Sequence, residues 1–83
     1  MNIHTYETLP DWRDHDTWYW AAFLTRELND DSKVGISKWC HETFGPPGFN
    51  HLTHQTRWED YVQWGEVCFI SEADREWFVL RWS

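Results

Sequence analysis

The residues best suited to chemistry are a cysteine and three histidines in the stretch CHETFGPPGFNHLTH: Cys40, His41, His51 and His54. Zinc takes thiolate sulfur and imidazole nitrogen as tetrahedral ligands, and a His-x-x-His pair can chelate it. Neighbouring residues on a helix diverge by about 100°, however, so Cys40 and His41 would not easily serve one ion. We therefore expect no metal site. Cys40, His51 and His54 remain the candidate ligands, and a core cysteine with surface histidines is the alternative.

The two cysteines are poor candidates for thiol catalysis or for a disulfide. A reactive thiolate needs an accessible, electropositive setting. Cys40 is expected to face inward from a helix, and Cys68 lies between Val67 and Phe69 in an expected strand. No signal-peptide pattern and no apolar run long enough for a membrane span is present in the sequence. We expect both thiols to be free packing residues in a reducing cytoplasm.

No other residue pattern completes an enzyme motif. General acid–base catalysis needs one carboxylate in an apolar setting and another in water. The run GPPG lacks the Lys-Ser/Thr of a phosphate-binding loop, and its prolines lack N–H donors. We therefore expect a protein that is not an enzyme and needs no cofactor. The paired carboxylates lie in polar connectors or beside an expected strand, at Asp14 and Asp16, Asp30 and Asp31, and Glu59 and Asp60.

The charge of the chain argues against nucleic acids and anionic membrane surfaces as partners. The formal net charge is −7, and the seven basic residues are scattered rather than clustered. Nucleic-acid binding normally needs a basic stripe that neutralises phosphates. An acidic surface is compatible instead with a basic protein as the partner.

The aromatic content predicts an interaction surface. Aromatic residues make up 19% of the chain and include eight tryptophans. A buried aromatic side chain removes on the order of 150–250 Å² from water, and a domain of this size buries only about 60–65% of its unfolded surface. So many rings are hard to hide, and an exposed aromatic patch usually marks an interface. Half burial of each ring is the alternative.

The first third of the chain predicts extended structure. Residues 1–16 contain Pro10 and show no sustained period, so we expect an extended arm with a short strand near residues 3–6. Residues 17–24, TWYWAAFL, would be apolar on both faces of a strand, as in a central strand covered on both sides. The alternative is a helix capped by Asp16. The aromatic content favours the strand.

A helix and a hairpin follow. Residues 31–44 carry an approximate helical stripe, and Gly45 followed by two prolines is typical of a helix end. After a loop, the stretch RWEDYVQWGEVCFIS predicts a β-hairpin. Its Gly65-Glu66 suits a two-residue type II′ turn, which would pair Trp64 with Val67.

The end of the chain predicts a second helix. Ser71 followed three residues later by Asp74 resembles a capping box. Ala73, Trp77 and Leu80 then share one helical face, which we expect to pack on the hairpin.

These elements together predict an α+β domain over residues 17–83, preceded by the N-terminal arm at residues 1–16. The topology is β-α-β-β-α, with two helices on one face of a three-stranded antiparallel sheet. The predicted core consists of Trp39, Phe44, Trp58, Val62, Phe69, Trp77 and Leu80. The aromatic residues left for binding a protein are Trp82, Phe78, Trp12, Trp20 and Phe49.

Three stretches carry a resemblance to a known group. They are WCHETFGPPG, the dipeptide Arg57-Trp58, and the closing FISEADREWFVLRW. Together they resemble small tailed-bacteriophage proteins that show a WC-x-x-x-FG helix end, an RW strand and a DA-x-x-F-x-LRW finish. The likeness covers about residues 36–83. This chain departs from the pattern at Ile70 and at Ala73-Asp74, which stand in the reverse of the usual order.

The resemblance implies a small phage protein in the host cytoplasm, although no activity is known for the group. We expect it to bind a host or viral protein through an aromatic patch with an acidic rim. The expected role is to inhibit or modulate a host complex of defence or transcription. The alternatives are a virion or assembly component, a self-associating protein that forms homo-oligomers, and a zinc-binding protein.

Overall fold

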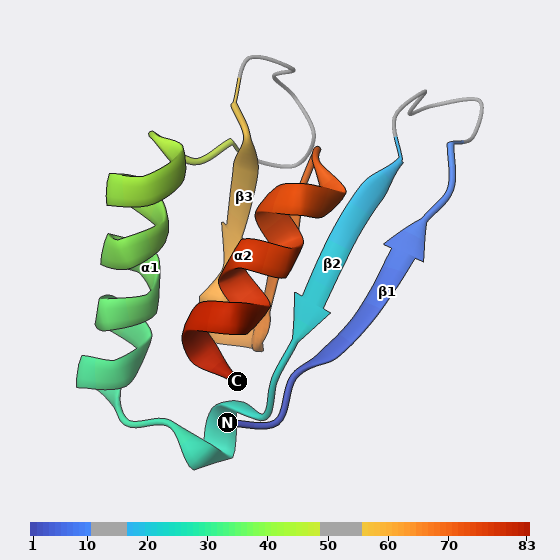
Figure 1. The fold of residues 1–83 in the computed structure, drawn as a ribbon. Helices are drawn as coiled ribbons and strands as arrows, with labels where there is room; N and C mark the ends of the chain where they lie inside the picture. The colour runs from blue at the N-terminus through green and yellow to red at the C-terminus, as the bar shows by residue number, and fades with distance from the viewer. Residues whose placement is uncertain (11–16, 49–55) are drawn as a thin grey trace.

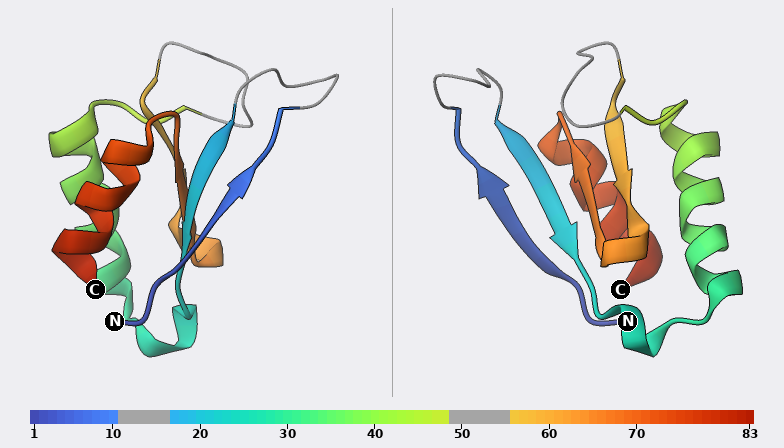
Figure 2. Two further views of the ribbon diagram at one scale, coloured as in Figure 1. Left: turned by 45° about the vertical axis from the view of Figure 1, so that its right-hand side comes forward. Right: turned by 180° about the vertical axis from the view of Figure 1, so that it is seen from behind.

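The computed structural model describes residues 1–10, 17–48 and 56–83. Four strands form one antiparallel sheet in the order β1-β2-β4-β3, and both helices cover the same face of that sheet (Figures 1 and 2). The α+β class is therefore confirmed. The elements in chain order are β1 (His4–Thr8), β2 (Trp18–Ala22), the 3₁₀ helix η1 (Thr25–Glu27), α1 (Asp30–Phe44), β3 (Trp58–Tyr61), the 3₁₀ helix η2 (Val62–Trp64), β4 (Glu66–Phe69) and α2 (Glu72–Trp82).

The predicted number of strands is wrong, because the N-terminal segment adds a fourth. The short strand expected near residues 3–6 is present as β1, and it pairs antiparallel with β2, with Tyr6 opposite Trp20. This pairing satisfies backbone groups along one edge of β2 that a free arm would leave open. β1 is consequently an edge of the sheet.

The strand predicted within residues 17–24 is present as β2, so the helix alternative is wrong, but the helices cover one face of this strand rather than both. β2 pairs with β1 on one side and with β4 on the other. Ala21 belongs to the core beneath the helices, and Arg75 of α2 lies over the ring of Tyr19, 5.3 Å from its centroid. By alternation, Trp18 and Trp20 point to the opposite face of the sheet.

The hairpin is present, but its predicted register is wrong. Trp58 lies opposite Phe69 and Tyr61 opposite Glu66, so Trp64 does not pair with Val67. The chain turns through η2 instead, and the N–H of Gly65 donates to the carbonyl of Val62 at 3.0 Å. Gly65 has a φ of 81°, a left-handed conformation that favours glycine and closes the longer turn.

The first helix ends where the sequence predicts. Asn29 caps its start by accepting a hydrogen bond from the N–H of Ser32 at 2.7 Å. Gly45, with a φ of 91°, ends it, and the Gly45 carbonyl accepts a hydrogen bond from the indole of Trp58 at 2.7 Å. The helix end and the hairpin are thereby joined through a buried tryptophan.

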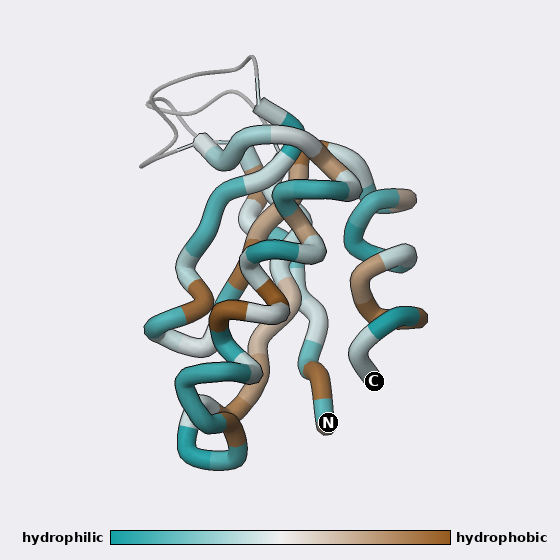
Figure 3. The backbone as a smooth tube through the Cα atoms, turned by 90° about the vertical axis from the view of Figure 1, so that its left-hand side faces the viewer, coloured by the Kyte–Doolittle hydropathy of each residue, from teal (hydrophilic) through white to brown (hydrophobic). Residues whose placement is uncertain are grey.

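The core lies between the helices and the sheet. Hydrophobic residues recur along both helices between hydrophilic ones (Figure 3). The predicted core residues Phe44, Trp58, Val62 and Phe69 are buried, and Trp39 packs partly buried against them. The complete buried cluster comprises Ala21, Phe23, Ile36, Cys40, Phe44, Trp58, Val62, Val67, Phe69 and Phe78.

The face of α2 that was predicted to be buried is the exposed one. Trp77 is 61% exposed and Leu80 is 83% exposed, whereas Phe78 is fully buried. The face turned to the sheet carries Arg75, Phe78 and Trp82, at i, i+3 and i+7 spacing. The core assignments of Trp77 and Leu80 are therefore wrong.

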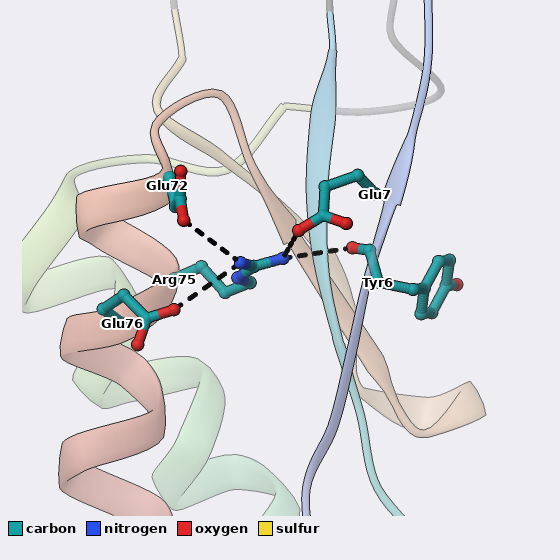
Figure 4. A network of polar contacts seen from close by, with 5 residues as sticks. All are labelled: Tyr6, Glu7, Glu72, Arg75 and Glu76. Atoms are coloured by element: carbon teal, nitrogen blue, oxygen red, sulfur yellow. Dashed lines mark hydrogen bonds and ion pairs between the residues drawn. The ribbon is translucent and has the colours of Figure 1, made fainter.

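Arg75 explains why this face of α2, and not the apolar one, packs on the sheet. The residue is 5% exposed, and its guanidinium donates to Glu7 at 2.6 Å and to the backbone carbonyl of Tyr6 at 3.3 Å, both on β1 (Figure 4). Glu72 and Glu76 of its own helix lie 3.7 and 3.5 Å away. A buried charge must be paired and hydrogen-bonded. These contacts therefore hold the Arg75 face of α2 against the sheet.

The start of α2 also differs from the prediction. Ser71 occupies the N-cap position but makes no capping hydrogen bond through its side chain. The carboxylate of Asp74 instead accepts two hydrogen bonds from the guanidinium of Arg57, at 2.8 and 3.1 Å. Asp74 thus joins α2 to the residue that precedes β3.

Candidate protein-binding surface

Three aromatic side chains cross the face of the sheet that the helices leave uncovered. The rings of Tyr6 on β1 and Trp20 on β2 stack at 5.7 Å between centroids and 2° between planes. Trp20 stacks in turn on Tyr61 of β3 at 5.6 Å. We name Tyr6, Trp20 and Tyr61 the aromatic row. Trp64, whose ring lies 6.5 Å from that of Tyr61, extends it at the turn.

The register explains why these rings meet. Tyr6 lies opposite Trp20, Trp20 lies opposite Cys68, and Tyr61 lies opposite Glu66. Side chains alternate between the two faces of a strand. Both helices lie on the other face of the sheet (Figure 2), so all of these residues point away from the helices.

Two carboxylates accompany the aromatic row. The hydroxyl of Tyr6 donates to Glu66, and that of Tyr61 donates to Glu59 at 2.8 Å. Glu59 is fully buried and Glu66 is partly exposed. Burial and the hydrogen bond to Glu66 raise the pKa of Tyr6 above its ordinary value. The surface therefore combines aromatic rings with carboxyl groups.

This combination suits recognition of a cation. A lysine or arginine side chain is attracted to a Trp or Tyr ring face that is not stacked on a neighbouring ring, and a carboxylate can pair with it. Tyr6 is 42% exposed and Trp64 is 73% exposed, so a partner can reach both ends of the surface. The surface holds no arrangement of nucleophile and base among the residues that the structure describes.

The predicted binding residues are only partly brought together. Trp20 lies at the centre of the aromatic row. Phe78 is wrong as a binding residue, because it is fully buried in the core. Trp82 packs on the core, with its ring 6.1 Å from that of Trp39, so it is not a free anchor. Trp12 and Phe49 lie outside the described residues.

Sequence reasoning missed Tyr6, Tyr61 and Trp64. Alternation in the hairpin does place Tyr61 on the face opposite Trp58, and that signal could have identified it. Tyr6 joins the surface only because β1 pairs with β2, which the sequence does not specify.

The cysteines lie in settings that suppress thiolate formation. Cys40 is fully buried in the core, and Cys68 is fully buried beside Glu59, 3.8 Å from its carboxylate. Burial is the main cause that raises the pKa of both thiols well above the ordinary value. Within residues 1–10, 17–48 and 56–83, no three His, Cys, Asp or Glu side chains are placed to hold a metal ion. His51 and His54 lie outside these ranges.

We expect both thiols to be unreactive in the folded protein. At about pH 8 an exposed cysteine is partly ionised and reacts readily with an aromatic disulfide reagent. Cys40 and Cys68 should react only after unfolding in urea, when both should titrate. Rapid reaction of either thiol in the native protein would contradict this environment.

Neither helix in the described part of the chain is long and apolar enough to cross a bilayer. Comparisons with protein-family models, with curated proteins and with solved structures give no significant match.

Proposed function

We propose that the protein is a non-enzymatic binding protein whose aromatic row engages a basic segment of another protein. The observation that carries this proposal is the stack of Tyr6, Trp20 and Tyr61 beside Glu66, on the sheet face that the described helices leave uncovered. Binding energy at protein interfaces is concentrated in Trp, Tyr and Arg side chains. An arginine of the partner would find rings and a carboxylate at one place.

The charge of the chain supports a basic partner. A net charge of −7 attracts positively charged proteins at long range and raises their association rate at low salt. Contacts between a cation and an exposed ring contribute about 0.5–1 kcal/mol each, and more when water is excluded. Several such contacts along the row would give specific but salt-sensitive binding.

The resemblance to tailed-bacteriophage proteins gives the class of partner to test first. A small phage protein without catalytic residues can act by occupying a surface of a host complex. The proposed role is therefore to inhibit or modulate a host complex of defence or transcription, in the host cytoplasm. A virion or assembly role would require the protein to copurify with particles.

A charge reversal at Glu66 tests this proposal. Glu66→Lys places a cation beside the row and should abolish capture of a basic partner from infected host cells, as read by mass spectrometry. The matched control is Glu42→Lys, which makes the same charge change at an exposed position on α1, an element on the other side of the sheet. Wild type and the control should recover one protein in near-equal amount.

The outcome must be separated from unfolding. Circular dichroism of Glu66→Lys should match that of wild type, because Glu66 is only partly buried. Equal recovery of the partner by all three proteins would contradict the proposed surface, as would binding that does not weaken with added salt.

A further inference from the structure

The outer face of α2 is an apolar surface that nothing in the described fold covers. Ala73, Trp77 and Leu80 lie on the side of α2 away from the sheet, and Trp77 and Leu80 are 61% and 83% exposed. With Arg81, these two line a hollow of about 310 Å³. We name Ala73, Trp77 and Leu80 the α2 stripe. The carboxylates of Glu72 and Glu76, 63% and 58% exposed, flank it.

A second hollow lies between α1 and η2. Its volume is about 600 Å³, and its apolar lining comes from Val34, Val62 and Trp64. Val34 is 65% exposed and Trp64 is 73% exposed. Lys33, Lys38 and His41 line it together with one carboxylate, that of Asp60. Lys33 and Lys38 are the only lysines in a chain of net charge −7, and they outnumber the single carboxylate of the groove.

We propose that the α2 stripe of one copy docks into the α1–η2 groove of a second copy. The two surfaces match in apolar content, because Trp77 and Leu80 would contact Val34 and Trp64. They also match in charge. Glu72 and Glu76 flank the stripe, and Lys33 and Lys38 border the groove.

One chain cannot make this contact with itself. The side of α1 that faces α2 carries Trp39, whose ring lies 6.3 Å from Phe78 and 6.1 Å from Trp82. The groove is on the side of α1 that faces η2 instead. The stripe and the groove therefore point away from each other, and the contact must join different copies.

Charge favours this contact over a symmetric pairing of two α2 stripes. A symmetric pair would place Glu72 and Glu76 of both copies around one interface and would leave both lysines unused. A stripe-to-groove contact is heterologous, so it extends into a ring or a filament rather than closing as a dimer. Because one helix face is a small interface, the association should be weak and concentration-dependent.

Two variants that each disable one surface test the proposal. The groove variant is Lys38→Glu, and the stripe variant is Trp77→Ala with Leu80→Ala. Light scattering after size-exclusion chromatography over a concentration series reads the mass. Wild type should form species larger than a dimer, and each variant alone should associate at least about tenfold more weakly. Mixed together, the variants should form a one-to-one heterodimer and nothing larger, because one intact stripe and one intact groove remain.

The control for the groove variant is Arg26→Glu, which makes the same charge change at an exposed residue of η1, outside the groove. It should associate like wild type, and circular dichroism should show the native fold for every variant. Three results would overturn the proposal. They are a wild-type protein that stays monomeric at every concentration, a groove variant that still dimerises alone through its stripe, and a mixture that stays monomeric. Trp64 borders both the groove and the aromatic row, but none of these substitutions changes Trp64 or a residue of the row, so failure of this test would not by itself contradict the proposed function.

Discussion

Replacing Phe78 by alanine is expected to lower the free energy of unfolding by about 3–5 kcal/mol. The side chain is fully buried, and its ring lies 5.8 Å from that of Phe69, 6.4 Å from Phe23 and 6.3 Å from Trp39. The truncation removes a ring that α2 places among Trp39 of α1, Phe69 of β4 and Phe23, the residue that follows β2. A domain of 83 residues is stable by about 4–12 kcal/mol, so this loss could leave it largely unfolded.

Trp77→Ala is the matched control, one residue away on the same helix. Trp77 is 61% exposed, and substitutions at such positions usually change stability by less than about 0.5 kcal/mol. Urea unfolding followed by circular dichroism should separate the two variants clearly. Equal destabilisation, or a larger loss for Trp77→Ala, would mean that α2 presents its other face to the sheet.

The orientation of α2 illustrates why sequence reasoning fails at this point. Ala73, Trp77 and Leu80 form a purely apolar face, while the face that is buried includes the charge of Arg75. Local hydrophobicity therefore favours the wrong face. Arg75 is buried because Glu7, 68 residues earlier, pairs with it across the sheet. A contact over such a separation leaves no periodic signal.

Features that depend on neighbouring residues could be predicted. The extent of α1, its end at Gly45 and the strand at Trp18–Ala22 follow from capping residues, helix breakers and aromatic content. The hairpin also follows, but its register depends on whether Gly65 begins a tight turn or closes a 3₁₀ helix. That choice is made by tertiary packing.

The candidate site, like the fold, could be predicted from the sequence only in part. The excess of aromatic residues predicts an exposed patch, and Trp20 is part of the aromatic row. Tyr6 and Tyr61 come from opposite edges of the sheet, and only the strand order brings their rings to either side of Trp20. Because β1 was not expected in the sheet, its contribution to the site could not be predicted.

Gly65→Ala is expected to destabilise the protein by about 3 kcal/mol, although it adds a single methyl group. A left-handed conformation costs an alanine about 1–2 kcal/mol, and Gly65 has a φ of 81°. A Cβ at this position would lie 2.4 Å from the carbonyl oxygen of Phe23. The backbone would have to move, which would strain the hydrogen bond from the N–H of Phe23 to the carbonyl of Gly65, now 2.8 Å long. The melting temperature should fall by on the order of 15 °C.

The same substitution at Gly35 should raise the stability instead of lowering it. This contrast attributes the loss at Gly65 to the local backbone conformation and crowding and not to the added methyl group itself. Gly35 lies inside α1, and a Cβ there would meet nothing within 4 Å. Glycine in a helix interior is less stable than alanine by about 0.5–1 kcal/mol, so Gly35→Ala should raise the melting temperature by a few degrees. Thermal unfolding of both variants measures the difference directly. If Gly65→Ala melted at the wild-type temperature, the chain would have to turn between β3 and β4 without a left-handed residue. The two-residue type II′ turn could not account for that result. It also needs a positive φ at its first central position, which is again Gly65.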